Sequence, residues 1–265
     1  MNGKILTFFV VSLWLFASCK GGDDQEVWFE TISMEKTVDL TDEDLSPNCS
    51  VSLKVQNARQ KSGKAAQVIN EYLVERLFNM QDISIEAAAE HFTQNYIQNY
   101  KNTLLPLYHQ DKADTTKRAW YDYHYIITTE TQTGNEHTIV YLATIDYYEG
   151  ASHGINELLV MNFDKETGKH LTLSDVFATG YEQQLTAILL KALKEKTGSE
   201  DLAALKEKGY LNAMDMFPTE NFILGEETIT FYYNPYEIAP YTMGATELII
   251  PYSDVDKILK NSFDY

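Results

Sequence analysis

Cysteine is scarce in this chain of 265 residues, which contains only Cys19 and Cys49. At most one intramolecular disulfide can form, so a disulfide-stapled scaffold is excluded. Cys49 precedes the alternating stretch Ser50–Val55, and we interpret it as a small strand hydrophobe rather than a nucleophile. Stability must then come from a packed core, which 44% hydrophobic residues and 18 tyrosines can supply.

Basic residues are also few, with 21 Lys and Arg against 39 Asp and Glu, and the formal net charge is −18. A chain of this charge repels phosphate backbones, which argues against nucleic acid as a partner. The same charge would attract cationic proteins at moderate salt. Solubility alone is the other explanation for such acidity, and the composition does not decide between them.

Metal-binding spacings are missing as well. No histidine stands in an H-x-H or H-E-x-x-H arrangement with another. Glu90 and His91 are neighbours on an expected helix, so they point about 100° apart and cannot chelate one ion together. We therefore expect neither a metal site nor a cofactor. The six histidines are His91, His109, His124, His137, His153 and His170.

Long apolar runs are limited to Ile5–Phe16, which is too short to span a bilayer. Lys4 precedes it, and two small residues followed by Cys19 come after it, an order that resembles the lipobox of a bacterial lipoprotein. Residues 1–18 would then be a signal peptide and Cys19 the lipidation site. Residues 19–26 would form an acidic, glycine-containing tether. We expect an outer-membrane lipoprotein of the cell envelope, exposed at the surface or facing inward, with a side-chain charge of −19 after loss of Lys4.

The hydrophobic period changes along the chain in the order ββ-αα-βββ-αα-βββ-α. A period of two over Ser50–Val55 indicates a strand, and the i, i+3, i+4 spacing within Ala65–Asn79 indicates a helix. Strands and helices do not alternate, so an α+β fold with mainly antiparallel sheets fits best. We expect two joined pieces, each with helices packed on a sheet, at residues 27–155 and 156–265.

Several element ends can be predicted from local signals. Ser84 is placed to cap a helix, and the missing N–H of Pro106 should end that helix. A strand is expected over Trp120–Thr129, and Gly198 should stop a later helix. Ser253 should cap a short final helix.

The loop at residues 150–154, Gly-Ala-Ser-His-Gly, satisfies the pattern G-x-S-x-G. A nucleophile elbow needs a strand, a sharp turn and then a helix, whereas a strand is expected to follow here. We favour a glycine-permitted turn fixed by His153, with a ligand-contact loop as the alternative. Asp146 and Glu149 lie near the loop, as the paired acids of a glycosidase would. Acids are common enough in this chain for such proximity to arise by chance.

A row of tyrosines accompanies the strands on either side of this loop. Such a row could form an aromatic platform for sugars, but it more often represents cross-strand packing in a sheet. The residues are Tyr121, Tyr123, Tyr125, Tyr141, Tyr147 and Tyr148.

Three stretches carry a resemblance to one bacterial extracytoplasmic family. They are Tyr147–Gly154, Met161–Phe177 and Phe231–Tyr252, of which the last is the most specific. Together they resemble the paired domains of unknown function shared by the anti-sigma factor RsiV and the non-catalytic part of the peptidoglycan deacetylase PdaC. The resemblance implies an N-terminal PdaC-like and a C-terminal RsiV-like α+β domain, the second with a topology like part of the Hsp70 ATPase. It does not imply ATPase activity.

The resemblance also bears on the ligand, because the extracytoplasmic part of RsiV recognises lysozyme. Ala151 and Ser152 depart from the loop pattern of the family, where glycine and alanine are usual. We expect a non-enzymatic binding module for a protein or cell-wall ligand, including a lysozyme-like cationic protein. The alternative is an enzyme acting on peptidoglycan or glycan. The candidate ligand-binding residues are Tyr148, Glu149, Ser152, His153, Asn234, Tyr236 and Tyr241.

Overall fold

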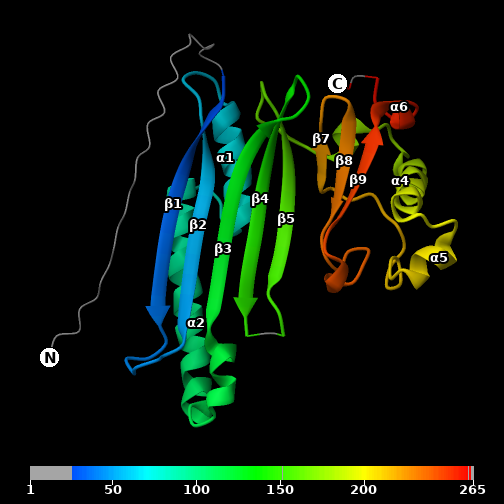
Figure 1. Ribbon diagram of the computed structural model, residues 1–265. Helices are drawn as coiled ribbons and strands as arrows, with labels where there is room; N and C mark the ends of the chain where they lie inside the picture. Colours follow the sequence, from blue (N-terminus) through cyan, green and yellow to red (C-terminus); the bar gives the residue numbers. More distant parts are fainter. Residues whose placement is uncertain (1–25, 151, 262, 264–265) are drawn as a thin grey trace.

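The computed structural model describes residues 26–150, 152–261 and 263, and it contains two sheets with helices packed on them (Figure 1). The signal peptide, Cys19 and all but the last residue of the expected tether lie outside the described residues. Within those residues, no helix combines the length and apolar character needed to cross a membrane. The mixed architecture with mainly antiparallel sheets confirms the α+β fold class.

The first sheet has six strands in chain order, β1 to β6. All neighbours are antiparallel except β2 and β3, which run parallel because α1 (Ala65–Phe78) and α2 (Ile85–Asp111) connect them. Both helices lie against one face of the sheet, behind the strands in Figure 1. The strands are β1 (Trp28–Asp39), β2 (Asn48–Arg59), β3 (Tyr123–Thr133), β4 (Thr138–Glu149), β5 (Ile155–Asp164) and β6 (His170–Leu171).

The alternation of buried and more exposed residues along β2 explains how the helices pack on the sheet. Val51, Leu53 and Val55 are buried on the helix side, where they join the same core as Ile69 and Leu73 of α1. The i, i+4 spacing places Ile69 and Leu73 on one stripe of α1, and this stripe meets the period-two face of the strand. Burial of such side chains stabilises the unit by about 1.5–3 kcal/mol each.

Two expected element ends are wrong. Helix α2 passes through Pro106 and ends at Asp111. Proline removes one hydrogen bond there, but Leu104 before it is buried and Tyr108 after it packs on Tyr121, so tertiary packing carries the helix past the proline. Ser253 does not cap α6 (Tyr252–Val255), because that helix begins one residue earlier, directly after Pro251.

The strand expected from Trp120 also begins later. Residues Thr115–Tyr121 form a 3-10 helix, η1, and β3 starts at Tyr123. Asp114 caps η1 by accepting a hydrogen bond from the Thr116 amide at 3.1 Å. Tyr121 is turned away from the strand, and its hydroxyl donates to Asp111 at 2.8 Å. These local polar contacts outweigh the strand propensity of the aromatic residues.

The second unit packs helices against a three-stranded antiparallel sheet of order β7-β8-β9. Gly198 stops α4 as expected, in the left-handed conformation that favours glycine. The strands are β7 (Phe222–Leu224), β8 (Thr228–Tyr233) and β9 (Thr246–Pro251). Their companions are α3 (Leu173–Val176), α4 (Glu182–Thr197), α5 (Leu202–Glu207), α6 and the 3-10 helix η2 (Tyr241–Met243).

The division between the two units lies later than the expected boundary at 155/156. Strand β5 pairs with β4 along its whole length, and β6 continues the same sheet to Leu171. Met161 and Phe163 of β5 belong to the first core. The ten-residue register with β4 therefore draws β5 into the first unit, although its chain position is next to the second.

Side-chain amides join the two units along a line that we call the asparagine seam, formed by Asn162, Asn221 and Asn234. Asn234 bonds both the amide and the carbonyl of Leu158 on β5, at 2.8 and 3.0 Å. Asn221 bonds the Leu158 carbonyl and the Val160 amide, at 2.8 and 2.6 Å. Asn221 and Asn234 thus satisfy backbone groups on the edge of β5 that no strand pairs, and Asn162 does the same for Phe222 and Leu224 of β7.

His170 makes one prediction about acid stability. Its ring stacks on Tyr72 of α1 at 4.2 Å between centroids, and burial, helped by Arg76, lowers the pKa of His170 to about 4. The unfolded chain takes up a proton near pH 6.5, whereas the folded one resists until about pH 4. Stability contributed by neutral His170 is therefore present above pH 6.5 and is lost as pH falls toward 4, by about 2 kcal/mol at pH 4.5.

The measurement is urea unfolding at pH 7 and pH 4.5 for the wild type and for His170→Phe, which keeps a ring on Tyr72 but cannot titrate. Carboxylates affect both proteins alike, so the difference between the two pH dependences isolates His170. The wild type should lose about 2 kcal/mol more than the variant. Parallel losses would contradict the assignment.

Candidate binding site at the junction of the two units

Two loops from different units meet at one end of the molecule. The first is the β4–β5 loop, which carries His153, and the second is the β8–β9 loop, residues 234–245, which carries Tyr236 and Tyr241. Gly150 enters the first loop with φ +73°, and a Cβ there would lie 2.4 Å from the carbonyl oxygen of Trp120. Glycine is thus required both by the backbone conformation and by the close approach of η1.

His153 packs against the two tyrosines of the other loop. Its ring is stacked on Tyr241 at 4.0 Å between centroids and is 6.1 Å from Tyr236. Nδ1 bonds the Gly154 carbonyl at 2.8 Å, so this nitrogen carries the proton. In the neutral ring, Nε2 accepts the hydroxyl proton of Tyr236, also at 2.8 Å. His153 therefore fixes its own turn, as expected, and also links the two units.

Tyr236 is held in an unusual position. Its backbone has φ +74°, a region that costs a non-glycine residue about 1–2 kcal/mol, and 57% of the residue is exposed. Glu237 beside it accepts a hydrogen bond from the Asn234 amide at 2.6 Å. Burial raises the pKa of Glu237, with a further contribution from Glu157. The turn therefore displays an aromatic ring at the surface despite a conformational cost.

A shallow groove of about 570 Å³ adjoins these rings, and we call it the junction groove. Tyr241 of the cluster and Asn234 of the seam both form part of its wall. Sequence reasoning did not single out Asn156 or Tyr232, and only the period-two pattern of β8 could have indicated Tyr232. The lining residues are Asn156, Tyr232, Asn234, Pro235, Tyr241, Thr242, Gly244 and Ala245.

The structure brings His153, Tyr236, Tyr241 and Asn234 to this site. Both ends of the Asn234 amide are engaged by Leu158, so Asn234 shapes the groove and has a structural role in the seam. Tyr148 lies elsewhere, against His124 on the helix-free face of the sheet, and Ser152 is exposed on the loop.

The two acids near the loop do not form a glycosidase pair. Glu149 accepts a hydrogen bond at 2.9 Å from Tyr96 of α2, on the helix side of the sheet. Asp146 is bonded to His124 at 2.8 Å and to Asn156 at 3.3 Å, on the opposite side. A glycosidic bond cannot lie between carboxylates on opposite faces of one sheet.

The G-x-S-x-G loop connects β4 to β5, so the residue after the serine does not open a helix. Both nitrogens of His153 are already engaged, by Gly154 and by Tyr236. The features that activate a serine nucleophile, a free base and helix-terminal amide donors, are therefore not assembled by the described residues.

The tyrosine row is mainly cross-strand packing. Tyr125 and Tyr147 are partners across β3 and β4, with their rings stacked at 5.5 Å. Phe92 and Tyr96 of α2 cover Tyr125 at 4.9 and 5.2 Å. A ring that lies under a helix cannot offer its face to a sugar.

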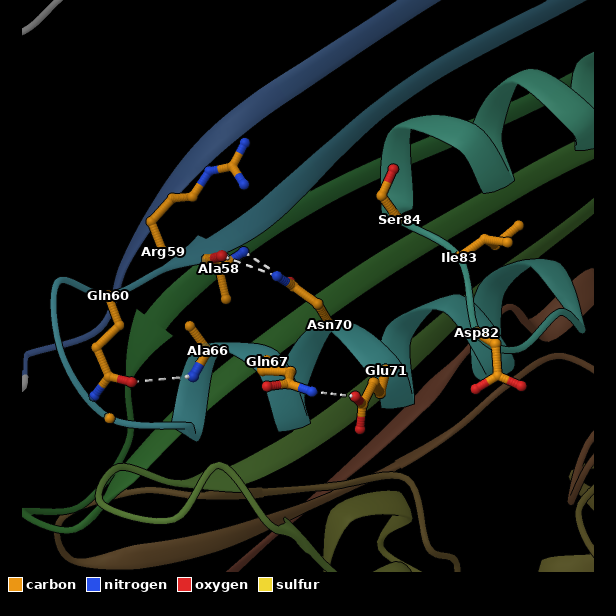
Figure 2. Close-up of a pocket in the computed structure, with 11 residues that line it drawn as sticks. Ala58, Arg59, Gln60, Ala66, Gln67, Asn70, Glu71, Asp82, Ile83 and Ser84 are labelled. Atoms are coloured by element: carbon orange, nitrogen blue, oxygen red, sulfur yellow. Dashed lines mark hydrogen bonds between the residues drawn. The ribbon is translucent and has the colours of Figure 1, made fainter.

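A second cavity, of about 590 Å³, lies between the end of β2 and the starts of both helices (Figure 2). Asn70 bonds the amide and the carbonyl of Ala58, both at 2.9 Å, and Gln67 donates to Glu71 at 2.7 Å. Arg59 is paired with Glu30 and Glu86. The polar groups of this second cavity hold α1 and α2 to the sheet, and no aromatic ring lines the cavity. We therefore favour the junction groove as the candidate binding site.

The thiol of Cys49 is not placed to act as a nucleophile. Cys49 is fully buried in the first core, and burial, with a smaller contribution from Glu149, raises the pKa of its thiol to about 12. A neutral, inaccessible thiol is a poor nucleophile. Across the described residues, no three histidine, cysteine or acidic side chains converge in a geometry suited to a metal ion.

Comparisons with known proteins give a family match over part of the chain and a fold for most of it. Residues 174–253 match the family "Protein of unknown function (DUF3298)". A solved DUF3298 family member from Bacteroides fragilis is similar over 90% of this chain and 96% of its own, with TM-score 0.83 and 28% identity. One from Pseudomonas aeruginosa covers the same shares with TM-score 0.58 and 18% identity, a likeness of fold alone. No curated protein matches the sequence.

Proposed function

The chain carries a DUF3298 domain at residues 174–253, and from this premise we propose that it is a lipid-anchored, non-enzymatic binding module of the cell envelope. The observation that carries the proposal is the stack of His153, Tyr236 and Tyr241 beside the junction groove. Three exposed or half-exposed rings, joined by stacking and by the hydrogen bond from Tyr236 to His153, offer a preformed contact surface. Such surfaces bind with little loss of conformational freedom.

The chemistry of the rings defines two ligand classes. Aromatic faces stack on the apolar faces of sugars, which suits a cell-wall glycan. They also attract Lys and Arg side chains through cation–π contacts, which suits a cationic protein. The acidic composition and the resemblance to a lysozyme-recognising family support the second class, with a lysozyme-like protein as the specific candidate.

Replacing His153 with alanine should weaken ligand binding by at least about tenfold, because the ring supports both tyrosines. Binding is measured by calorimetric titration with muropeptides and with lysozyme, at low and at physiological salt. His91→Ala on the outer surface of α2 is the matched control and should bind like the wild type.

Titration with an unrelated protein of the same positive charge as lysozyme distinguishes specific recognition from nonspecific electrostatic attraction. Equal affinity for both proteins, lost together as salt rises, would leave only nonspecific attraction and would contradict recognition. Release of a product from muropeptides or acetylated glycans would instead favour the enzymatic alternative. Such activity should then be sensitive to His153→Ala or Glu149→Gln.

The membrane anchor has its own test. Mass spectrometry of the mature chain should find an N-terminus at Cys19 with acyl chains attached, since the lipobox places the cut before that residue. The Cys19→Ala variant should be released from the membrane fraction, because no second anchor is expected. An intact Met1, or a cut at another position, would refute lipidation.

A further inference from the structure

The end of the first unit that carries the β1–β2 loop exposes several large apolar side chains. We call this surface the pole; it consists of residues 41–47, the end of α2 and η1, at the lower end of the sheet in Figure 1. Leu45 is 84% exposed, Trp120 55% and Leu107 48%. No other large hydrophobic residue among the described ones is as exposed as Leu45. The pole therefore gathers apolar surface that the core does not use.

The apolar tip is held rigidly. Arg118 of η1 donates from Nε to the Leu45 carbonyl at 2.7 Å and from Nη2 to the Ser46 carbonyl at 3.1 Å. The Asn48 amide donates to Asp122 at 2.9 Å, which ties the same two segments a second time. A surface fixed before contact loses little freedom on binding, as interface anchors require.

Leu45 is displayed at a conformational cost. Its backbone has φ +59°, a region in which leucine is disfavoured by about 1–2 kcal/mol and glycine is not. Burial of the side chain does not offset this conformational cost, since most of the residue is exposed to solvent. Neither the core nor the turn geometry explains leucine at this position, whereas contact with a partner would.

The charge of the pole indicates the partner. Its basic side chains are all paired: Lys112 with Glu43 at 2.9 Å, Lys117 with Asp111 at 2.7 Å and Arg118 with Asp122 at 3.7 Å. Asp42 and Asp44 form no ion pair among the described residues. An apolar tip within an acidic rim complements a basic amphipathic segment.

The position of the pole favours a protein over a lipid surface. β1 begins at Trp28, next to the expected tether, and runs twelve residues toward the pole. At about 3.3 Å per residue, the pole lies about 40 Å from the start of the strand. The proposed attachment through Cys19 would therefore hold the chain by the end of the sheet opposite the pole. We propose that the pole docks a basic amphipathic segment of a partner protein, with Leu45, Leu107 and Trp120 as its apolar anchors.

Trp120 can report on this contact directly. Trp14 lies in the expected signal peptide, so the processed Trp28→Phe variant has Trp120 as its single tryptophan. Titration with a synthetic leucine–lysine amphipathic helix at physiological salt should shift its emission to the blue and saturate. Oligolysine of equal charge should produce no such shift, because charge without apolar contact does not desolvate the indole.

Leu45→Gly, made in the single-tryptophan background, separates docking from folding. Glycine relieves the strained φ, so the melting temperature should change little, while affinity for the peptide should fall about tenfold. Ile249→Ser is the matched control, since Ile249 is 61% exposed on β9 outside the pole, and it should bind normally. His153→Ala should also bind normally, which distinguishes the pole from the junction groove.

Several outcomes would overturn the proposal. The absence of a shift at millimolar peptide, or equal affinity of Leu45→Gly and the wild type, would exclude a pole that docks basic segments. A shift produced by phosphatidylcholine vesicles and not by the peptide would make the pole a lipid contact. Self-association abolished by Leu45→Gly, without peptide binding, would make it an interface between copies of this chain.

Discussion

Replacing Asn162 with alanine is expected to lower the free energy of unfolding by about 3 kcal/mol. Asn162 is 1% exposed, and its amide donates to the Phe222 carbonyl at 2.7 Å and accepts from the Leu224 amide at 3.1 Å. Alanine leaves both backbone groups of β7 buried without partners, and each such loss costs about 1–3 kcal/mol. The melting temperature should fall by roughly 6–12 °C in calorimetry.

Asn156→Ala is the matched control on the same strand. Asn156 is exposed, and its amide reaches only Asp146, at 3.3 Å, so its loss should change stability by less than about 0.5 kcal/mol. The wild type should melt in a single transition, because the seam couples the two units. If Asn162→Ala proved as mild as Asn156→Ala, the asparagine seam would not be what holds them together.

Gly168→Ala should cost still more, about 4 kcal/mol. Gly168 follows the turn after β5 with φ +73°, and a Cβ there would lie 2.2 Å from the carbonyl oxygen of Ala65 at the start of α1. Neither side can move easily, because the Gly168 amide is bonded to the Asp164 carbonyl at 2.9 Å and Ala65 is buried. The substitution therefore combines backbone strain with a clash between two fixed segments.

Gly180→Ala isolates the strain from the clash. Gly180 also has a positive φ, of +86°, but nothing lies within 4 Å of the position that a Cβ would take there. It should cost only about 1–2 kcal/mol, the penalty of the left-handed conformation. Chemical denaturation of both variants measures the difference. Equal costs would mean that the contact between Gly168 and α1 can relax.

Periodicity was sufficient for the main elements because the core imposes it. The apolar stripe of Ala65–Phe78 and the alternation of β2 are both consequences of facing one interior. Local signals were correct where the backbone conformation decides, as at Ser84, which accepts a hydrogen bond from the Ala87 amide. They failed at Pro106, where the burial of Leu104 and the packing of Tyr108 on Tyr121 outweighed the tendency of proline to end a helix.

The candidate site was predictable only in part. His153, Tyr236 and Tyr241 stand in glycine- and proline-containing loops, which a sequence marks as exposed, and the structure brings these loops together. The asparagine seam has no comparable signal in the sequence. An asparagine whose side chain bonds the backbone of a strand edge cannot be told from any other polar residue by sequence alone. Its partners lie 60 or more residues away, as for Asn162 and Phe222, and nothing local encodes that distance.

The position of β1 has a mechanical consequence. A load applied between the start of β1 and the junction groove or the pole would pull on opposite ends of the first sheet (Figure 1). The tension then runs parallel to β1, whose twelve residues are all paired with β2. The inter-strand hydrogen bonds lie across the strands, so they are sheared together rather than unzipped one by one. The first strand of the sheet is thus arranged to bear force along its length.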